Sequence, residues 1–114
     1  MKRQILIIIL AIYINNKPNQ KHHFLTNKNS HYTGKFRDIV SKYGLDLNKE
    51  WNIEEMPHLG RHPNAYHEYM LKHLEKIDKE ANLNVDKFMK LFEKLKDVIK
   101  DNPAMLTAEY WRVK

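Results

Sequence analysis

Histidines gather in two short runs of this 114-residue chain. His22 and His23 adjoin in the first run, and the second run, about forty residues later, holds His58, His62 and His67. Imidazole is the commonest metal ligand in proteins and the usual general base near neutral pH. Two groups of this residue type therefore predict a metal-dependent active site.

The first run cannot easily place both of its histidines on one ion. Successive side chains of an extended segment point to opposite faces, so His22 and His23 would point apart. We therefore expect one of them to bind metal and the other to act on water. A competing interpretation of the second run is that His62 only caps a helix and that His67 is a hydrogen-bonded core residue. The grouping of five histidines within a basic segment favours a site.

Positive charge surrounds the adjacent histidines. The chain has a net charge of +6 and a pI near 9.5. Between residues 17 and 44 the only acidic side chain is Asp38, against the basic residues Lys17, Lys21, Lys28, Lys35, Arg37 and Lys42. A polyanion bound there would gain from counterion release, which favours nucleic acid as the partner. The alternative is that the basic composition serves solubility alone.

The composition also limits the kind of site. The chain has no cysteine, which excludes a disulfide framework and a cysteine-rich zinc module. Any metal must then be held by His, Asn, Asp or Glu. A length of 114 residues fits one domain with a single modest core.

The first sixteen residues differ in character from the rest. Lys2 and Arg3 precede an apolar run from Ile5 to Ile14, which is typical of a signal peptide but equally fits a terminal strand or a disordered leader. The run is too short for a transmembrane helix, so we expect no stable membrane span. A polar, proline-containing linker follows, and we divide the chain into an apolar leader, residues 1–16, and a working domain, residues 17–114.

The elements that position the histidines follow from apolar spacing and helix signals. His22 and His23 end a short extended segment, and a polar loop follows it at residues 26–30. A short helix is predicted from an N-cap at Thr33 to Gly44. A second short helix is predicted from a cap near Asp46 or Asn48 to a point before Pro57, with Trp51 as a core anchor.

Two longer helices should complete the domain. The first begins at Pro63, with His62 at its cap, and ends near Ala81; its core-facing side includes His67, whereas His73 lies at the boundary or surface. The second is capped by Asn84, has apolar positions 85, 88, 89, 92, 95, 98 and 99, and stops at Asn102-Pro103. The tail, with Leu106, Tyr110 and Trp111, should pack on the core.

Taken together, several motifs resemble the AHH family of nuclease domains, which belongs to the HNH and endonuclease VII superfamily. The resemblance covers about residues 18–111. That family is known as the C-terminal toxin cassette of bacterial polymorphic toxins, including LXG-type secreted toxins. The motifs are His22-His23-Phe24, Asn27-Lys28-Asn29, Tyr43-Gly44-Leu45-Asp46-Leu47, Trp51-Asn52, Met56-Pro57-His58-x-Gly60-Arg61-His62-Pro63 and Tyr66-His67.

The resemblance implies a ββα-metal, treble-clef-like site within a domain that is mainly α with a small β element. By this resemblance His22 binds the metal and His23 is the general base that activates water. His58, His62 and His67 match the family's remaining histidines, and the motif leaves open how they divide ligation, base work and phosphate contact. We assign His58 to catalysis, and His62 and His67 to the metal.

The remaining site residues are expected to bind substrate. Arg61 is the candidate phosphate clamp because its fork matches phosphate geometry, although it could instead pair on the surface with Glu54 or Glu55. The residues assigned to substrate binding are Lys21, Asn27, Lys28 and Asn29. A set rich in histidine favours zinc, nickel or manganese, while a single His ligand with waters would allow magnesium.

The residues and the resemblance together predict a metal-dependent endonuclease that hydrolyses phosphodiester bonds of DNA or RNA, and the resemblance implies that it is a toxin neutralised by a cognate immunity protein. It would be secreted or delivered into the cytoplasm of a target cell, or be cytoplasmic as an orphan cassette. The sequence departs from the family at Lys21, which stands in the alanine position, and in having only sixteen residues where a delivery domain normally precedes. The alternatives are a non-catalytic, basic nucleic-acid-binding helical domain, which would be a degenerate cassette, and a structural zinc module.

Overall fold

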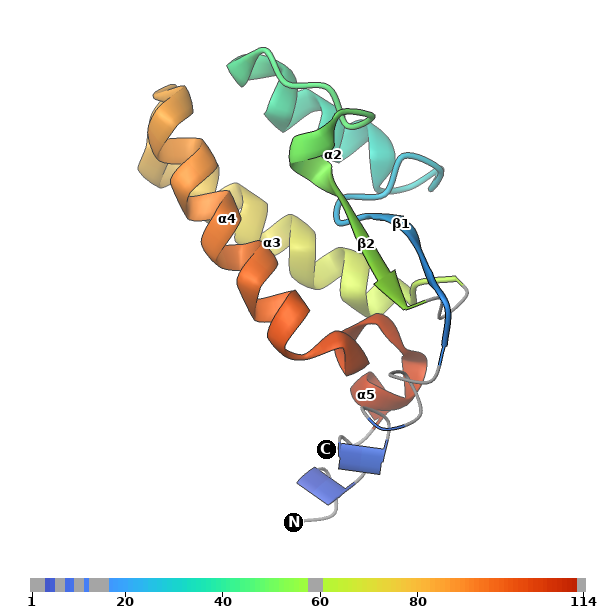
Figure 1. Cartoon of the computed structure of the whole chain (residues 1–114). Coiled ribbons are helices and arrows are strands. Elements are labelled where there is room, and N and C mark those ends of the chain that lie inside the picture. The colour runs from blue at the N-terminus through green and yellow to red at the C-terminus, as the bar shows by residue number, and fades with distance from the viewer. Residues whose placement is uncertain (1–3, 6–7, 10–11, 13–16, 58–60, 113–114) are drawn as a thin grey trace.

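A computed structural model describes residues 4–5, 8–9, 12, 17–57 and 61–112 (Figure 1). The domain is mainly α with one small sheet, as predicted. Its strands and α-helices are β1 (Asn19–His23), α2 (Thr33–Val40), β2 (Ile53–Pro57), α3 (Asn64–Ala81), α4 (Val85–Asp101) and α5 (Ala108–Arg112). Short 3-10 helices lie at Ser41–Tyr43, Glu50–Asn52 and Pro103–Leu106.

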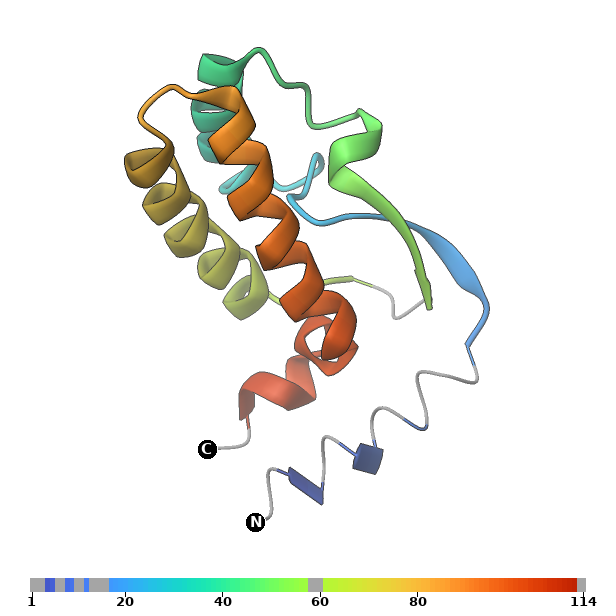
Figure 2. The ribbon, with the colours of Figure 1, turned by 60° about the vertical axis from the view of Figure 1, so that its left-hand side comes forward.

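The helices α3 and α4 run side by side and antiparallel, and they carry much of the core (Figures 1 and 2). Their facing stripes bury Met70, Leu71, Leu74 and Ile77 on α3, and Phe88, Phe92, Leu95 and Ile99 on α4. The predicted cap of α4 is confirmed, because Asn84 Oδ1 accepts a hydrogen bond from Lys87 N at 3.0 Å. The predicted end of α3 near Ala81 and the predicted stop of α4 at Asn102 are confirmed too. Two of the apolar positions noted for this helix, Val85 and Val98, are exposed, at 41% and 46%.

The sheet joins segments that are distant in sequence. β1 pairs antiparallel with β2, with His22 opposite Glu54 and His23 opposite Ile53. The short helix predicted to end before Pro57 is therefore wrong: only one 3-10 turn forms at Glu50–Asn52, and the chain then becomes strand. Hydrogen bonds with β1 stabilise the extended backbone of β2, so this segment does not continue the helix.

α2 packs on α3 and is continued by the 3-10 turn at Ser41–Tyr43, which ends at Gly44 with a φ of 71°. Gly44 takes the left-handed conformation without a side-chain penalty, which confirms the predicted stop. The predicted N-cap was one residue late, because Thr33 is the first helical residue and Tyr32 holds the cap position. Pro63 likewise holds the cap position of α3, which the prediction had given to His62.

The tail packs on the core as predicted. Leu106 is buried, Tyr110 and Trp111 pack against the core, and Trp111 Nε1 donates to Met105 O at 2.9 Å. Of the first sixteen residues, the described ones are helical and exposed and do not form a strand. None of the helices in the described part of the chain combines the length and apolar character needed to cross a bilayer. The division into residues 1–16 and 17–114 stays a prediction.

Candidate active site

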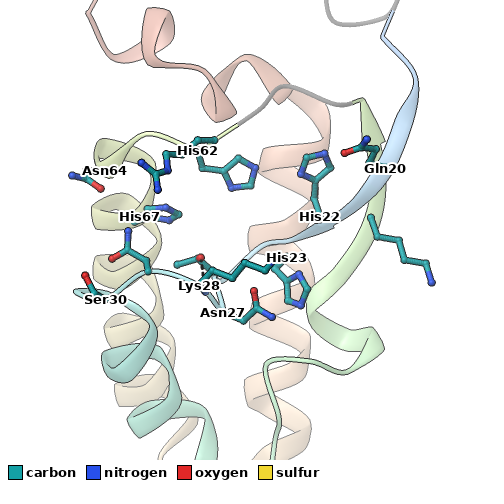
Figure 3. Close-up of a pocket in the computed structure, with 13 residues that line it drawn as sticks. Gln20, His22, His23, Asn27, Lys28, Ser30, His62, Asn64 and His67 are labelled. Atoms are coloured by element: carbon teal, nitrogen blue, oxygen red, sulfur yellow. Dashed lines mark hydrogen bonds between the residues drawn. The ribbon is translucent and has the colours of Figure 1, made fainter.

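Both histidine runs open onto one cavity of about 690 Å³, between the end of β1, the loop after it and the start of α3 (Figure 3). Nine of the ten residues predicted for the site line it; the tenth, His58, lies outside the described residues. The lining residues are Gln20, Lys21, His22, His23, Thr26, Asn27, Lys28, Asn29, Ser30, Arg61, His62, Asn64 and His67. The fold thus brings together side chains that are up to forty-seven residues apart in the sequence.

Three histidines face one another across the upper part of this cavity. The rings of His22 and His62 stack with centroids 5.4 Å apart, and those of His62 and His67 lie 6.1 Å apart. Figure 3 shows His22 reaching in from β1, His62 from the segment just before α3 and His67 from the first turn of α3. His67 is 4% exposed, which confirms that it lies on the core-facing side of its helix. We call these residues the histidine triplet.

Burial keeps two members of the triplet, His62 and His67, uncharged near neutral pH. Burial, strengthened by repulsion from His22 and His67, lowers the pKa of His62 to about 4. Burial also lowers the pKa of His67 below its ordinary value. Only the neutral imidazole offers a lone pair to a metal, so these histidines are in the form that a ligand requires.

The donor atoms of the triplet fit a divalent ion. His62 Nε2 and His67 Nδ1 are buried without a hydrogen-bond partner, which is costly for a polar atom unless a ligand completes it. Imidazoles that share a tetrahedral ion have ring centroids roughly 5 Å apart, close to the spacing of His22 and His62. Within the described ranges, however, no three or more His, Cys, Asp or Glu side chains are already gathered closely enough to hold an ion. The residue types suit a divalent ion, and the three side chains would have to move closer together to bind it.

Two buried polar side chains hold the backbone around the first histidine run. Asn52 accepts from Leu25 N and donates to Leu25 O, both at 2.8 Å, and it also donates to Leu47 O at 2.9 Å. Tyr66 OH donates to Phe24 O at 2.8 Å, which ties α3 to the residue after His23. Both side chains lie within the motifs that marked the family resemblance, but sequence reasoning gave neither a role. Their positions next to aromatic and histidine residues offered no separate signal.

His23 points away from the triplet, as the alternation of an extended segment predicts (Figure 3). Its side chain lies near Asn48, a residue that sequence reasoning did not include in the site. Burial lowers the pKa of His23, the Asn48 hydrogen bond acts in the opposite direction, and the charge of Lys28 lowers it further. A histidine that is neutral near pH 7 can accept a proton from water.

The loop after His23 is organised by its own side chains. Asn29 Oδ1 accepts from His31 N at 2.8 Å and from Tyr32 N at 3.0 Å, which starts α2. Asn27 Nδ2 donates to Asn48 Oδ1 at 2.7 Å. The predicted substrate contacts of Asn27 and Asn29 stay predictions, and each side chain already has a role in the protein itself.

At the start of α3 the cavity is lined by a basic side chain and by the N-terminal end of the helix. Arg61 and Asn64 line the cavity at the N-terminus of α3, where the helix dipole and backbone N–H groups favour an anion. Two glutamates were predicted as possible surface partners of Arg61. One of them, Glu54, instead pairs with Lys100, with Oε2 and Nζ 3.6 Å apart. Lys21 and Lys28 are exposed on the cavity rim. These groups can bind a phosphate between the basic side chains, with the start of α3, and the histidines.

Comparison with known proteins agrees with this geometry. A family model described as a nuclease family of the HNH/ENDO VII superfamily with conserved AHH matches residues 12–101, which include every residue that lines the cavity. No curated protein and no solved structure matches the chain. Nucleases of this superfamily generally use a divalent metal, and their substrate is nucleic acid. Because the match covers well over half of its residues, the chain belongs to the AHH family of nucleases within the HNH/ENDO VII superfamily.

Proposed function

We propose that the protein is a metal-dependent endonuclease in which the histidine triplet holds the ion and His23 is the general base. The observation that carries the proposal is the meeting of both histidine runs in one basic cavity, with the triplet on one side and His23 on the other. A purely structural metal site would gain nothing from a separate histidine aimed at the same cavity. This division also follows from the alternation of side chains along β1.

Within this proposal the ligands are His22, His62 and His67. A divalent ion bound there would polarise the phosphodiester and stabilise the charge that develops on its oxygens. A set of imidazole ligands favours zinc, nickel or manganese, and magnesium stays possible if waters complete the shell. His58, which we predicted to be catalytic, is not needed for this division of roles.

The protein's own groups supply the remaining steps. His23, neutral near pH 7, takes a proton from the water that attacks phosphorus. Arg61 and the N-terminus of α3 bind the phosphate and stabilise its extra negative charge as the bond from the water oxygen to phosphorus forms and the P–O bond to the leaving strand breaks, with the leaving oxygen protonated by solvent. Lys21 and Lys28 attract the nucleic-acid backbone to the cavity and keep it there.

A cleavage assay with a panel of metals tests the proposal. Supercoiled plasmid and single-stranded RNA are each incubated with metal-stripped protein, and then with zinc, nickel, manganese or magnesium. We expect cleavage of at least one substrate with at least one metal, and no cleavage after EDTA. Activity that survives complete metal removal would refute the metal-dependent mechanism. The same panel identifies the nucleic acid and the ion.

We further propose that the nuclease acts as a toxin in the cytoplasm of a target cell and is neutralised by an immunity protein. The support for this context is the family resemblance. Induced expression of the wild-type chain should stop growth of a bacterial host, whereas the His23→Ala variant should not. Equal growth with both proteins, at equal protein levels, would argue against a toxic nuclease. Suppression of the wild-type effect by a co-expressed gene would identify the immunity partner.

A further inference from the structure

Two uncharged amide side chains line the cavity and have no part in the mechanism above. Gln20 lies on β1, two residues before His22, and Asn64 is the first residue of α3. Residues two apart on a strand share a face, so Gln20 lies on the same face as His22. Figure 3 shows Gln20 and Asn64 at opposite ends of the site, with His22 and His62 between them. The two amides therefore bracket the proposed metal site.

These amides differ from the other two that line the same cavity. Asn27 Nδ2 donates a hydrogen bond at 2.7 Å and Asn29 Oδ1 accepts two, at 2.8 and 3.0 Å, all within the protein. Gln20 and Asn64 are exposed, and in the part of the chain that the structure describes neither side-chain amide has a hydrogen-bond partner. Their donors and acceptors are therefore free for a ligand.

The chemistry of an amide differs from that of the basic side chains beside it. Lys21, Lys28 and Arg61 carry positive charge and only donate, which suits a phosphate. A Gln or Asn amide is uncharged and offers both a donor and an acceptor. A phosphodiester has no donor and would leave the amide oxygen without a partner. Adenine suits the amide better, because its N6 amino group donates and its N7 accepts, so both bonds form at once.

The cavity has room for more than one phosphate group. Its volume of about 690 Å³ lies within the range of roughly 300–1,000 Å³ that is typical of sites for whole small ligands. Parts of the nucleotides next to the cut phosphate can therefore enter the cavity with it. Because the amides lie at opposite ends of the site, each would meet the nucleotide on one side of the cut.

We propose that Gln20 and Asn64 determine where the nucleic acid is cut, by recognising adenine on either side of the scissile phosphate. This inference rests on the proposed function, since it places the scissile phosphate at the histidine triplet. The basic residues then supply affinity for any sequence, and the two amides supply the preference among sequences.

The first test maps the cleavage sites. DNA and RNA pools of random sequence are cut by the wild-type protein with the ion that supports cleavage, and the new ends are sequenced. Adenine should be enriched at least about 5-fold at one position on each side of the cut, the low end for an amide–adenine pair. Gln20→Ala should lose the enrichment on one side, and Asn64→Ala on the other. Asn19→Ala is the matched control, exposed on β1 but not lining the cavity, and should keep both.

The second test measures binding without cleavage, in the His23→Ala protein. Gln20→Ala should lower affinity for an adenine oligonucleotide about 5-fold and leave affinity for a cytosine oligonucleotide unchanged. The slope of log K against log salt should stay the same, because an uncharged amide displaces no counterion. An equal loss for both oligonucleotides, or a slope reduced by about one, would assign Gln20 to the sugar–phosphate backbone and overturn its role.

A further variant separates recognition by Asn64 from the stability of α3. Asn64→Asp keeps the shape and an acceptor but loses the donor, and a carboxylate in the first turn stabilises a helix. The melting temperature should therefore not fall, whereas the adenine enrichment on that side should disappear. A lower melting temperature with an unchanged cleavage pattern would make Asn64 a residue of the helix start alone and overturn its role.

The outcomes distinguish the two proposals. A wild-type protein that cuts without base preference would leave the proposed function standing and overturn the recognition by amides. So would an adenine enrichment that survives in both alanine variants. A wild-type protein that cuts nothing would refute the proposed function, and the oligonucleotide affinities would still decide whether the amides recognise adenine.

Discussion

At the scale of single residues, the site depends on histidines that burial keeps neutral. The pKa of His62 lies near 4 in the folded protein because the ring is buried and faces His22 and His67. The unfolded chain, by contrast, takes up a proton near the ordinary value of 6.5. Folding therefore suppresses protonation at this position, and the suppression makes the stability of the protein depend on pH.

The sign of this dependence gives the first prediction. A group whose pKa is depressed by folding contributes stability that is present above pH 6.5 and is lost as the pH falls toward 4. In metal-free protein the free energy of unfolding should fall across this window by at most about 3 kcal/mol for His62. Urea denaturation at several pH values measures the loss. His62→Asn should show a shallower fall, and an identical fall in both proteins would contradict the assignment.

The residue types of the site could be predicted from sequence, but their partners could not. Imidazoles beside basic residues predicted the metal ligands, the base and the phosphate contact, and these side chains do line one cavity. Asn48 gave no such signal, because asparagine is common in turns and its side chain comes near His23 only after the sheet and the turn have folded. Asn52 and Tyr66 were missed for the same reason.

At the scale of elements, α3 and α4 followed from sequence because each has a helical apolar period and clear end signals. β2 did not, because its five residues, Ile53 to Pro57, include Glu54 and Glu55 and have no continuous apolar pattern. Its extended form depends on pairing with β1. A local pattern cannot reveal a strand whose stability is supplied by a distant partner.

The junction between β1 and α3 gives a prediction at this scale. Tyr66→Phe removes only the hydroxyl that donates to Phe24 O, and it leaves that buried carbonyl without this donor. The free energy of unfolding should drop by about 1–3 kcal/mol. Urea denaturation measures it, with Tyr69→Phe as a control because Tyr69 is only partly buried. A Tyr66→Phe protein as stable as the control would show that the hydrogen bond does not hold the two elements together.

At the scale of the whole molecule, the net charge and the position of the basic residues both indicate a polyanionic substrate. The net charge is +6, and Lys21, Lys28 and Arg61 border the cavity in which the histidines meet. Binding by neutralisation of phosphates releases counterions, so affinity should fall as salt rises. This behaviour can be measured without cleavage by using the His23→Ala protein.

The salt dependence of that binding separates cavity residues from other basic residues. Adding Arg61→Ala to the His23→Ala protein should lower affinity for a labelled oligonucleotide and reduce the slope of log K against log salt by about one. Lys79→Ala, at the far end of α3, should change neither quantity. Equal slopes for the Arg61 and Lys79 variants would place the nucleic acid elsewhere on the surface.

The central claim, that the histidine triplet holds a metal while His23 acts as the base, is tested most directly by measuring cleavage and metal binding on the same variants. His23→Ala should lose cleavage of the preferred substrate and still bind the ion with near wild-type affinity by calorimetry. His62→Ala should lose both, and His73→Ala, a half-buried histidine elsewhere on α3, should lose neither. Cleavage by His23→Ala at the wild-type rate, or wild-type metal affinity in His62→Ala, would contradict the account.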